Sequence, residues 1–360
     1  MAIQPAAGVP LAPLTTLGIG GAAQWFLRAT TADEIAEAHK WSEQARLPMF
    51  VLGGGSNVVI ADAGIQGLVV AMAIAGMEFR RSGNDTMVSA GAGAPWDPLV
   101  QEAVRRGLAG LECLSGIPGS VGGTPIQNVG AYGQDVSSVI QDVTVFDRAS
   151  RELVVIAGAD CGFGYRTSRF KHRDASRLIV CGVTFRLRPG VATVTYPDVV
   201  TLLQQKAGRT LTVGDVREAV LTTRRRKGMV LDPSDPDTRS VGSFFTNPVV
   251  ETGIHARVAS ASGDPVPGFA ADAGQVKMSA AWLIERAGYA RGHLAGRVGL
   301  SSKHPLAIVN RGGGTARDVL DFASQIKRAV VDRFGIWLVP EPVFVGLDDE
   351  PEVEFLKRGG

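Results

Sequence analysis

The chain has 360 residues, of which 45% are hydrophobic and 20% are charged. This balance is typical of a folded protein of two or three domains and excludes a largely disordered chain. Lys and Arg number 37 against 35 Asp and Glu, a net charge of +2, so we expect no nucleic-acid or membrane partner. No apolar run approaches the roughly 20 residues of a spanning helix, and the start lacks the pattern of a signal peptide. We therefore expect a cytoplasmic protein.

The cysteines and histidines form no pattern of their own. Cys113, Cys161 and Cys181 are too far apart in sequence for a disulfide framework or a zinc site, and we expect them to be buried, reduced thiols. No two of the five histidines, and no His and Cys, have the spacing of metal ligands. The sequence predicts no metal site.

The first 76 residues have the pattern of a small α/β domain. A helix is predicted over 31–46, because Thr31 can cap it and Glu34 stands three positions later. Short buried strands are predicted at 48–52, 58–60 and 68–70.

Many short strands follow in residues 77–227, which we expect to be an α+β domain. Strands are predicted at 87–90, 143–146, 153–156 and 178–187, and helices at 97–106 and 213–227. A third domain is predicted over 228–360, beginning with the Pro- and Asp-rich segment 228–240, which we expect to be mobile. It continues with a helix at 279–287, a strand at 306–309, a long helix at 315–334 and a closing strand at 337–345.

Three consecutive glycines follow the strand predicted at 48–52, in the sequence Gly53-Gly-Gly-Ser-Asn57. Successive N–H groups of such a loop can converge on a phosphate. A plain tight turn explains the same residues equally well.

A second glycine-rich stretch covers 107–133 and contains Pro118 and Pro125. Much of it is apolar, so an irregular backbone would be buried and would need hydrogen-bond partners. A large polar cofactor could supply them, as could a packed loop with its own internal bonds.

Three further positions carry candidate chemistry. Arg166 lies among aromatic residues and could direct its guanidinium at a carboxylate. Ser243, in Gly-Ser-Phe-Phe, has no nucleophile elbow around it, so a hydrolase serine is not indicated. Glu341 lies between two prolines in an apolar segment and suits general acid work if it is held in a site. Each could instead be structural: an ion pair, a turn and an exposed edge.

The order of these motifs resembles the UDP-N-acetylenolpyruvoylglucosamine reductase family over nearly the whole chain. The resemblance implies a mixed α+β and α/β fold in three domains, 1–76, 77–227 and 228–360. The first two would form a two-part FAD-binding region of the vanillyl-alcohol-oxidase-like type. The third would be an α+β substrate-binding domain whose C-terminal strand returns to the active site. The implied FAD-binding residues are Gly53, Gly54, Gly55, Ser56, Asn57, Ile117, Pro118, Gly119, Ser120, Gly122, Gly123, Asn128, Gly130, Ala131 and Tyr132.

The same resemblance implies an activity: reduction of an enolpyruvyl ether of a UDP-sugar to a lactyl ether, with NADPH as reductant, FAD as carrier and a monomer as the working form. Ser243 would give a proton to C2 of the substrate, and Arg166 and Glu341 would stabilise the enolic intermediate. The implied substrate-binding residues are Tyr165, Tyr196, Lys227, Asn247 and His304. For Lys227, a cation at a helix C-terminus is an equally good interpretation.

Two other functions remain as alternatives. An FAD-dependent oxidase of a small alcohol or sugar would share the FAD-binding region but would need a different third domain. A nucleotide-binding protein without catalytic activity would give a colourless preparation, whereas a flavoprotein is yellow.

Overall fold

The computed structural model describes residues 3–191, 194–205, 208 and 210–359. The chain divides into two compact units, which are described separately below. Unit 1 comprises Met1–Val9, Ala23–Gly55 and Gln66–Val230, and unit 2 comprises Pro10–Ala22, Ser56–Ile65 and Leu231–Gly360. Two short N-terminal segments therefore belong to the same unit as the C-terminal part of the chain. The division into three domains stays a prediction.

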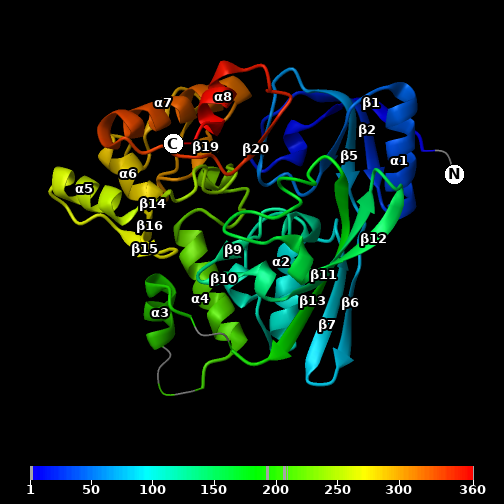
Figure 1. Ribbon diagram of the computed structural model, residues 1–360, viewed down its shortest axis with the longest axis horizontal. Coiled ribbons are helices and arrows are strands. Elements are labelled where there is room, and N and C mark those ends of the chain that lie inside the picture. The colour runs from blue at the N-terminus through cyan, green and yellow to red at the C-terminus, as the bar shows by residue number, and fades with distance from the viewer. Residues whose placement is uncertain (1–2, 192–193, 206–207, 209, 360) are drawn as a thin grey trace. The chain divides into compact units, whose positions relative to one another are not determined.

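A four-stranded sheet forms one part of unit 1, in the order β1 (Ala6–Pro10), β2 (Ala22–Ala29), β5 (Ile65–Met72), β3 (Met49–Leu52). Strands β3 and β5 are parallel. The helix α1 (Ala32–Ala45) connects β2 to β3 and lies beside this sheet (Figure 1). Thr31 and Glu34 form a reciprocal capping box at its start, so the helix predicted from these two residues is confirmed.

A larger sheet forms the rest of the unit 1 core, in the order β12 (Glu152–Ala157), β11 (Ile140–Asp147), β13 (Leu178–Pro189), β7 (Asp85–Gly91), β6 (Met77–Ser82). All its pairings are antiparallel, and β8 (Leu108–Ala109) pairs with the end of β13. The long hairpin of β6 and β7 is visible in cyan in Figure 1. The helix α2 (Trp96–Arg105) buries Trp96, Leu99, Val100 and Ala103 in this core. The strands and the helix predicted here are confirmed.

Two helices complete unit 1. The predicted helix α4 (Val213–Arg226) begins with a capping box between Thr212 and Asp215. It packs against α3 (Pro197–Gln204), which the sequence pattern did not predict. The two share a small core that includes Cys113, Val199 and Val220.

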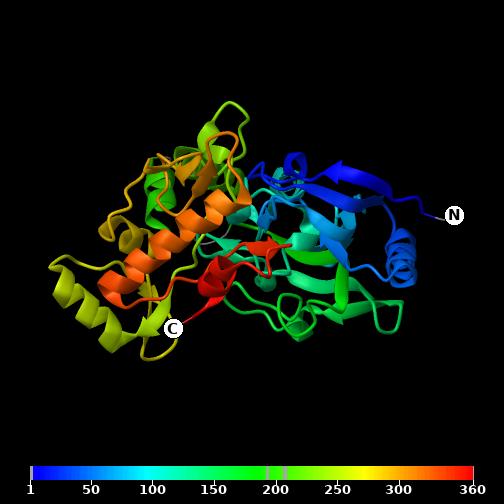
Figure 2. The ribbon, with the colours of Figure 1, turned by 90° about the horizontal axis from the view of Figure 1, so that it is seen from above.

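Unit 2 combines short strands with helices. Strand β20 (Val343–Val345) pairs in parallel with β4 (Val58–Ile60). Two three-stranded sheets have the orders β14 (Val249–Glu251), β16 (Gln275–Met278), β15 (Gly268–Ala270) and β17 (Leu294–Ala295), β18 (Val298–Leu300), β19 (Ile308–Asn310). The helices are α5 (Thr252–Ser262), α6 (Ala280–Arg286), α7 (Ala316–Phe334) and α8 (Pro351–Lys357). Helix α8 lies against α7, as Figure 2 shows in red and orange.

The long helix α7 supplies much of the unit 2 core. Its predicted apolar stripe is buried at Val319, Phe322, Ala323, Ile326 and Val330. The closing strand predicted at 337–345 is shorter than expected: the strand β20 covers only Val343–Val345. Pro340 and Pro342 in this segment have no N–H to donate to a neighbouring strand.

The segment 228–240 was expected to be mobile because of its composition. Beyond residue 230 it is held by side-chain contacts within unit 2. Asp237 is 3% exposed, accepts hydrogen bonds from Ser302 and pairs with Arg311 at 2.8 Å. Asp235 pairs with Lys303 at 2.6 Å. These contacts argue against free motion of the segment.

The three cysteines are free and buried, as predicted. None of the helices in the described part of the chain combines the length and the apolar character needed to cross a membrane.

Candidate active site

Ser243 lies at a point where three segments of unit 2 are joined. The amide of the next residue, Phe244, donates to the carbonyl of Leu306 at 2.7 Å. The carbonyl of Phe244 accepts from the amide of Glu341 at 2.8 Å. Ser243 Oγ lies 3.4 Å from His304 Nε2. The backbone of Phe244 therefore brings Ser243, His304 and Glu341 into one neighbourhood.

The Gly-Ser-Phe-Phe sequence explains this placement. Gly242 has a φ of 77°, a conformation that a residue with a side chain rarely adopts, and it turns the chain just before Ser243. Phe244 and Phe245 are 0% and 1% exposed. Since both rings are fixed in the core, the half-buried Ser243 is held at its edge.

Glu341 is positioned through its backbone. Its neighbour Pro340 forms a bridge with Phe245, and its own carbonyl accepts from Asn57 Nδ2 at 3.3 Å. The carbonyl of Asn57 accepts from Val343 N–H at 3.0 Å. The half-buried Glu341 thus lies in a held segment, which favours the site interpretation over an exposed edge.

Asn247, predicted to contact substrate, has a structural use. Its Oδ1 accepts from the amide of Ala280 at 2.9 Å, at the first residue of α6. This contact satisfies one of the amides that a helix start leaves without a partner. The substrate contact of Asn247 stays a prediction.

In unit 1, the two predicted cofactor loops meet backbone to backbone. A Cβ placed on Gly54 would lie 2.6 Å from Cα of Gly119, and one on Gly53 would lie 3.1 Å from Ser120 Oγ. At Gly54, only glycine permits an approach this close to a backbone atom. Gly54 therefore has a packing role, and the phosphate role of Gly53 and Gly54 stays a prediction.

Part of the second loop bonds to its own surroundings. The carbonyl of Gly119 accepts from Trp96, and the amides of Val121 and Gly122 donate to Ala94 and Ala92. These bonds are those of a packed loop. Ser120 differs: its Oγ is buried and has no hydrogen-bond partner in the described part of the chain. A buried hydroxyl without a partner is costly, so it fits a ligand that supplies one. The loop thus combines both interpretations that the sequence left open.

Three predicted site residues share an unusual backbone conformation. Asn128, Tyr132 and Arg166 have φ values of 47°, 53° and 54°, and they make up three of the five non-glycine residues with positive φ among those described. Each such residue costs of order 1 kcal/mol or more, and such residues concentrate at binding sites.

Arg166 joins the members of this group. Its guanidinium donates to the carbonyl of Gly130 at 2.7 Å and to that of Asn128 at 3.5 Å. The exposed ring of Tyr165 lies 5.6 Å from the guanidinium carbon. The Asn128 side chain in turn donates to the carbonyl of Gly164 at 3.0 Å. The structure therefore places Arg166 beside the predicted loop 128–132.

The other predicted substrate residues in unit 1 form an aromatic and cationic cluster. The rings of Tyr132 and Tyr196 meet edge to face at 4.9 Å. Lys227 Nζ lies 3.4 Å from the Tyr196 hydroxyl and 2.9 Å from Asp198. Burial opposes the charge of Lys227, but Asp198 and the tyrosines outweigh it and raise the lysine pKa. Burial raises the pKa of Tyr132.

Arg224 stands behind this cluster and is structural. It is 9% exposed and donates to the carbonyls of Met229 and Gly116. Lys227 is the C-cap residue of α4. A cation at the helix end and a member of the aromatic cluster are therefore compatible interpretations of this residue. Asp198 was not predicted as part of this group, although it stands only two residues after Tyr196 in the sequence.

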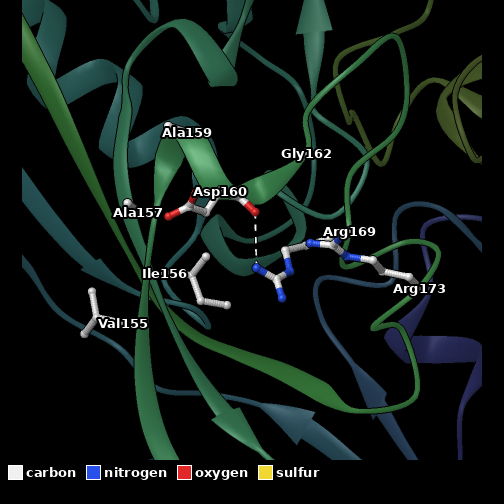
Figure 3. Close-up of a pocket in the computed structure, with 8 residues that line it drawn as sticks. All are labelled: Val155, Ile156, Ala157, Ala159, Asp160, Gly162, Arg169 and Arg173. Carbon is white, nitrogen blue, oxygen red and sulfur yellow. Dashed lines mark hydrogen bonds between the residues drawn. The ribbon is translucent and has the colours of Figure 1, made fainter.

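A shallow depression elsewhere in unit 1 contains none of the predicted site residues (Figure 3). Its two arginines are engaged in hydrogen bonds and ion pairs. Arg169 donates to the carbonyl of Asp160 at 3.2 Å, and Arg169 and Arg173 both pair with Asp174. We assign no function to it.

Comparisons with known proteins show the family of the chain. Residues 233–345 match the family model for the C-terminal domain of UDP-N-acetylenolpyruvoylglucosamine reductase, and residues 23–156 match an FAD binding domain. UDP-N-acetylenolpyruvoylglucosamine reductase of Thermobifida fusca is 47% identical over 95% of this chain and 98% of its own length. That of Mycobacterium marinum is also 47% identical, over 95% of each chain.

Among solved structures, that of the corresponding reductase from Thermus caldophilus matches 95% of this chain and 99% of its own length, with 27% identity and a TM-score of 0.63. The match of the C-terminal domain removes the oxidase alternative, which needed a different third domain. The chain belongs to the UDP-N-acetylenolpyruvoylglucosamine reductase family.

Proposed function

We propose that this protein reduces UDP-N-acetylenolpyruvoylglucosamine to UDP-N-acetylmuramate, with NADPH as reductant and FAD as bound cofactor. One observation carries the proposal: in a chain that matches a reductase of this family over 95% of its length, the backbone of Phe244 joins the segments of Ser243 and Glu341. The product belongs to peptidoglycan precursor synthesis, and we place this step in the cytoplasm with a monomer as the working form.

The FAD would be held by the two glycine-rich segments predicted for it. The loop Gly53–Asn57 would hold its pyrophosphate through backbone N–H groups. Ser120 Oγ would gain the partner that it lacks in the described residues. When bound, FAD would supply the two-electron chemistry that links NADPH to C3 of the enolpyruvyl group. The remaining predicted FAD contacts are Ile117, Pro118, Gly119, Gly122, Gly123, Asn128, Gly130, Ala131 and Tyr132.

The chain's own residues would stabilise the negative charge on the substrate and deliver the proton to C2. Arg166, held by the carbonyls of Asn128 and Gly130, would stabilise the substrate carboxylate as negative charge spreads onto it. Glu341 would stabilise the enolic form from its held segment. Ser243 would deliver the proton to C2, so that the lactyl ether is completed.

The UDP-sugar would be bound by Tyr196 and Lys227, beside the predicted FAD contact Tyr132. The raised pKa of Lys227 keeps its ammonium charged at neutral pH, which suits contact with a diphosphate. Tyr165, Asn247 and His304 complete the proposed substrate residues. The predicted three-domain division, with 228–360 binding substrate, is proposed on the same basis.

The test measures NADPH oxidation by the purified yellow protein with and without UDP-N-acetylenolpyruvoylglucosamine. We expect turnover that depends on this substrate and yields UDP-N-acetylmuramate. Two half-reactions can then be followed separately in the absence of oxygen: bleaching of the flavin by NADPH, and its reoxidation by substrate. Failure of the substrate to reoxidise the reduced flavin would refute the proposal.

A further inference from the structure

Ser243 has a side-chain neighbour whose position is fixed by backbone bonds. His304 Nε2 lies 3.4 Å from Ser243 Oγ. His304 begins a turn closed by the amide of Ala307, which donates to the His304 carbonyl at 3.2 Å. The same turn receives the amide of Phe244 at the carbonyl of Leu306, 2.7 Å away. Because Phe244 follows Ser243, the hydroxyl and the imidazole are held together by the main chain.

The base of this turn is also held. The amide of Ser301 donates to the carbonyl of Ala307 at 2.8 Å, and Ser301 Oγ accepts from the amide of Lys303 at 3.1 Å. Ser301 is 0% exposed and Ala307 is 1% exposed. His304 is therefore carried on a rigid turn, and the distance to Ser243 follows from the fold.

A serine that protonates carbon has a specific need. Its hydroxyl has one hydrogen, which must point at C2 of the substrate, and two lone pairs, which can accept hydrogen bonds. As the proton leaves, negative charge develops on Oγ. A donor aimed at Oγ turns the hydrogen towards the substrate and stabilises the alkoxide that remains. Catalytic hydrogen bonds are often long in structures without substrate and tighten in the reacting complex.

We propose that His304 is the positioning residue of Ser243: its Nε2–H donates to Ser243 Oγ and stabilises the serine alkoxide. This rests on the proposed function and replaces direct substrate binding as the role of His304. In the step, the Ser243 O–H bond breaks as the C2–H bond forms, and C2 loses the negative charge that hydride addition at C3 created. The alkoxide, held by Nε2–H, then takes a proton from water.

The proposal predicts a hierarchy among variants. His304→Ala removes the donor, so flavin reoxidation at saturating substrate should slow by about 10- to 100-fold, the effect of one hydrogen bond to a charged group. His304→Gln keeps an N–H on a side chain of similar reach and should recover most of that rate. Bleaching of the flavin by NADPH should be unchanged in both variants, which also shows that they are folded and loaded.

A double-variant cycle distinguishes action through Ser243 from action on substrate. His304→Ala should cause no further loss when introduced into Ser243→Ala, because the oxygen that it serves is already gone. The dissociation constant of the substrate should stay the same in all four proteins.

Three results would overturn the inference: an unchanged rate with weakened substrate binding in His304→Ala, a full additional loss in the Ser243→Ala background, or a His304→Gln variant as slow as His304→Ala. Each can occur while the unmodified protein turns over the substrate normally. Failure of this inference is therefore distinct from failure of the proposed function.

Discussion

The side-chain amide of Asn57 donates to the main-chain carbonyl of Glu341 at 3.3 Å, and the carbonyl of Asn57 accepts from Val343 N–H at 3.0 Å. Asn57 was predicted only as a phosphate-loop residue. The structure adds a second role, since Asn57 fixes the segment that carries Glu341, the proposed stabiliser of the enolic form.

Replacing Asn57 by Asp should therefore affect substrate chemistry as well as FAD binding. The variant keeps the size of the side chain but puts an oxygen where the N–H donor stood, facing a carbonyl. We expect flavin reoxidation by substrate to slow by about tenfold, the worth of one neutral hydrogen bond, with a smaller effect on bleaching by NADPH. Asn84→Asp, in an exposed turn, is the control. Equal slowing of both half-reactions would contradict the Glu341 role.

Ser243→Ala should separate the two half-reactions. It removes the proposed proton donor, so reoxidation by substrate should fall by about 10²- to 10⁴-fold, the range of general acid catalysis. Reduction of the flavin by NADPH needs no proton from Ser243 and should be normal. Ser279→Ala is the matched control, because Ser279 Oγ caps α6: it should lower thermal stability and spare both rates. Loss of both half-reactions in Ser243→Ala would refute the donor role.

Gly54→Ala should disturb the proposed FAD loops. The added Cβ would lie 2.6 Å from Cα of Gly119, and a backbone atom cannot move aside as a flexible side chain can. Overpacking of this kind costs about 1–3 kcal/mol, so the purified variant should carry less flavin and melt earlier. Gly253→Ala is the control, because a Cβ there meets nothing within 4 Å. A Gly54→Ala protein with its full content of FAD would show that FAD binding does not need the close approach of Gly54 to Gly119.

How far the sequence could predict these features depends on the range of the interactions. The helix α1 was predicted from the capping pair Thr31 and Glu34 and from its apolar face, and α7 from its apolar stripe, because each pattern recurs within a few residues. The helix α3 was missed, since it has eight residues and only Val199 and Leu203 among them are buried.

The site shows the same limit. Ser243 and Glu341 could be singled out from local motifs and from the family resemblance. The backbone hydrogen bonds of Phe244 to Leu306 and Glu341 could not be predicted. Almost any residue type can form such backbone bonds, so the sequence gives no sign of them. Likewise, the Pro- and Asp-rich composition of 228–240 indicates mobility, while the partners of Asp235 and Asp237 lie more than sixty residues further along the chain.

The three thiols should be inert in the native protein. Burial raises the pKa of Cys113 to about 12 and those of Cys161 and Cys181 to about 11, with Glu112 adding to the effect at Cys113. The thiolate is the reactive form, so an aromatic disulfide reagent at pH 8 should label none of them on the timescale of a free thiol. The same reagent in guanidinium chloride should count three thiols per chain. Rapid labelling of the folded protein would contradict this burial.

Lys327 should make the stability of unit 2 depend on pH. It is 0% exposed, and its Nζ donates to the carbonyls of Leu356 and Arg358 at 2.8 and 2.6 Å. Replacing it with Met leaves these carbonyls without their donor, so the free energy of unfolding should fall by about 1–3 kcal/mol at pH 7. Lys357→Met, which alters a half-exposed side chain, is the control and should have little effect.

The pH dependence has a definite sign. Burial, with a smaller repulsion from Arg358, lowers the pKa of Lys327 from 10.5 to about 8. Between these two values the unfolded chain binds a proton at Lys327 that the folded chain does not, so the stability contributed by Lys327 rises with pH in this window. The difference in unfolding free energy between the unmodified protein and Lys327→Met should therefore widen from pH 7.5 to pH 9.5, measured by denaturant titration at each pH. A difference that narrows would mean that Lys327 stays charged in the fold, held by the two carbonyls and the rings of Trp337 and Phe355.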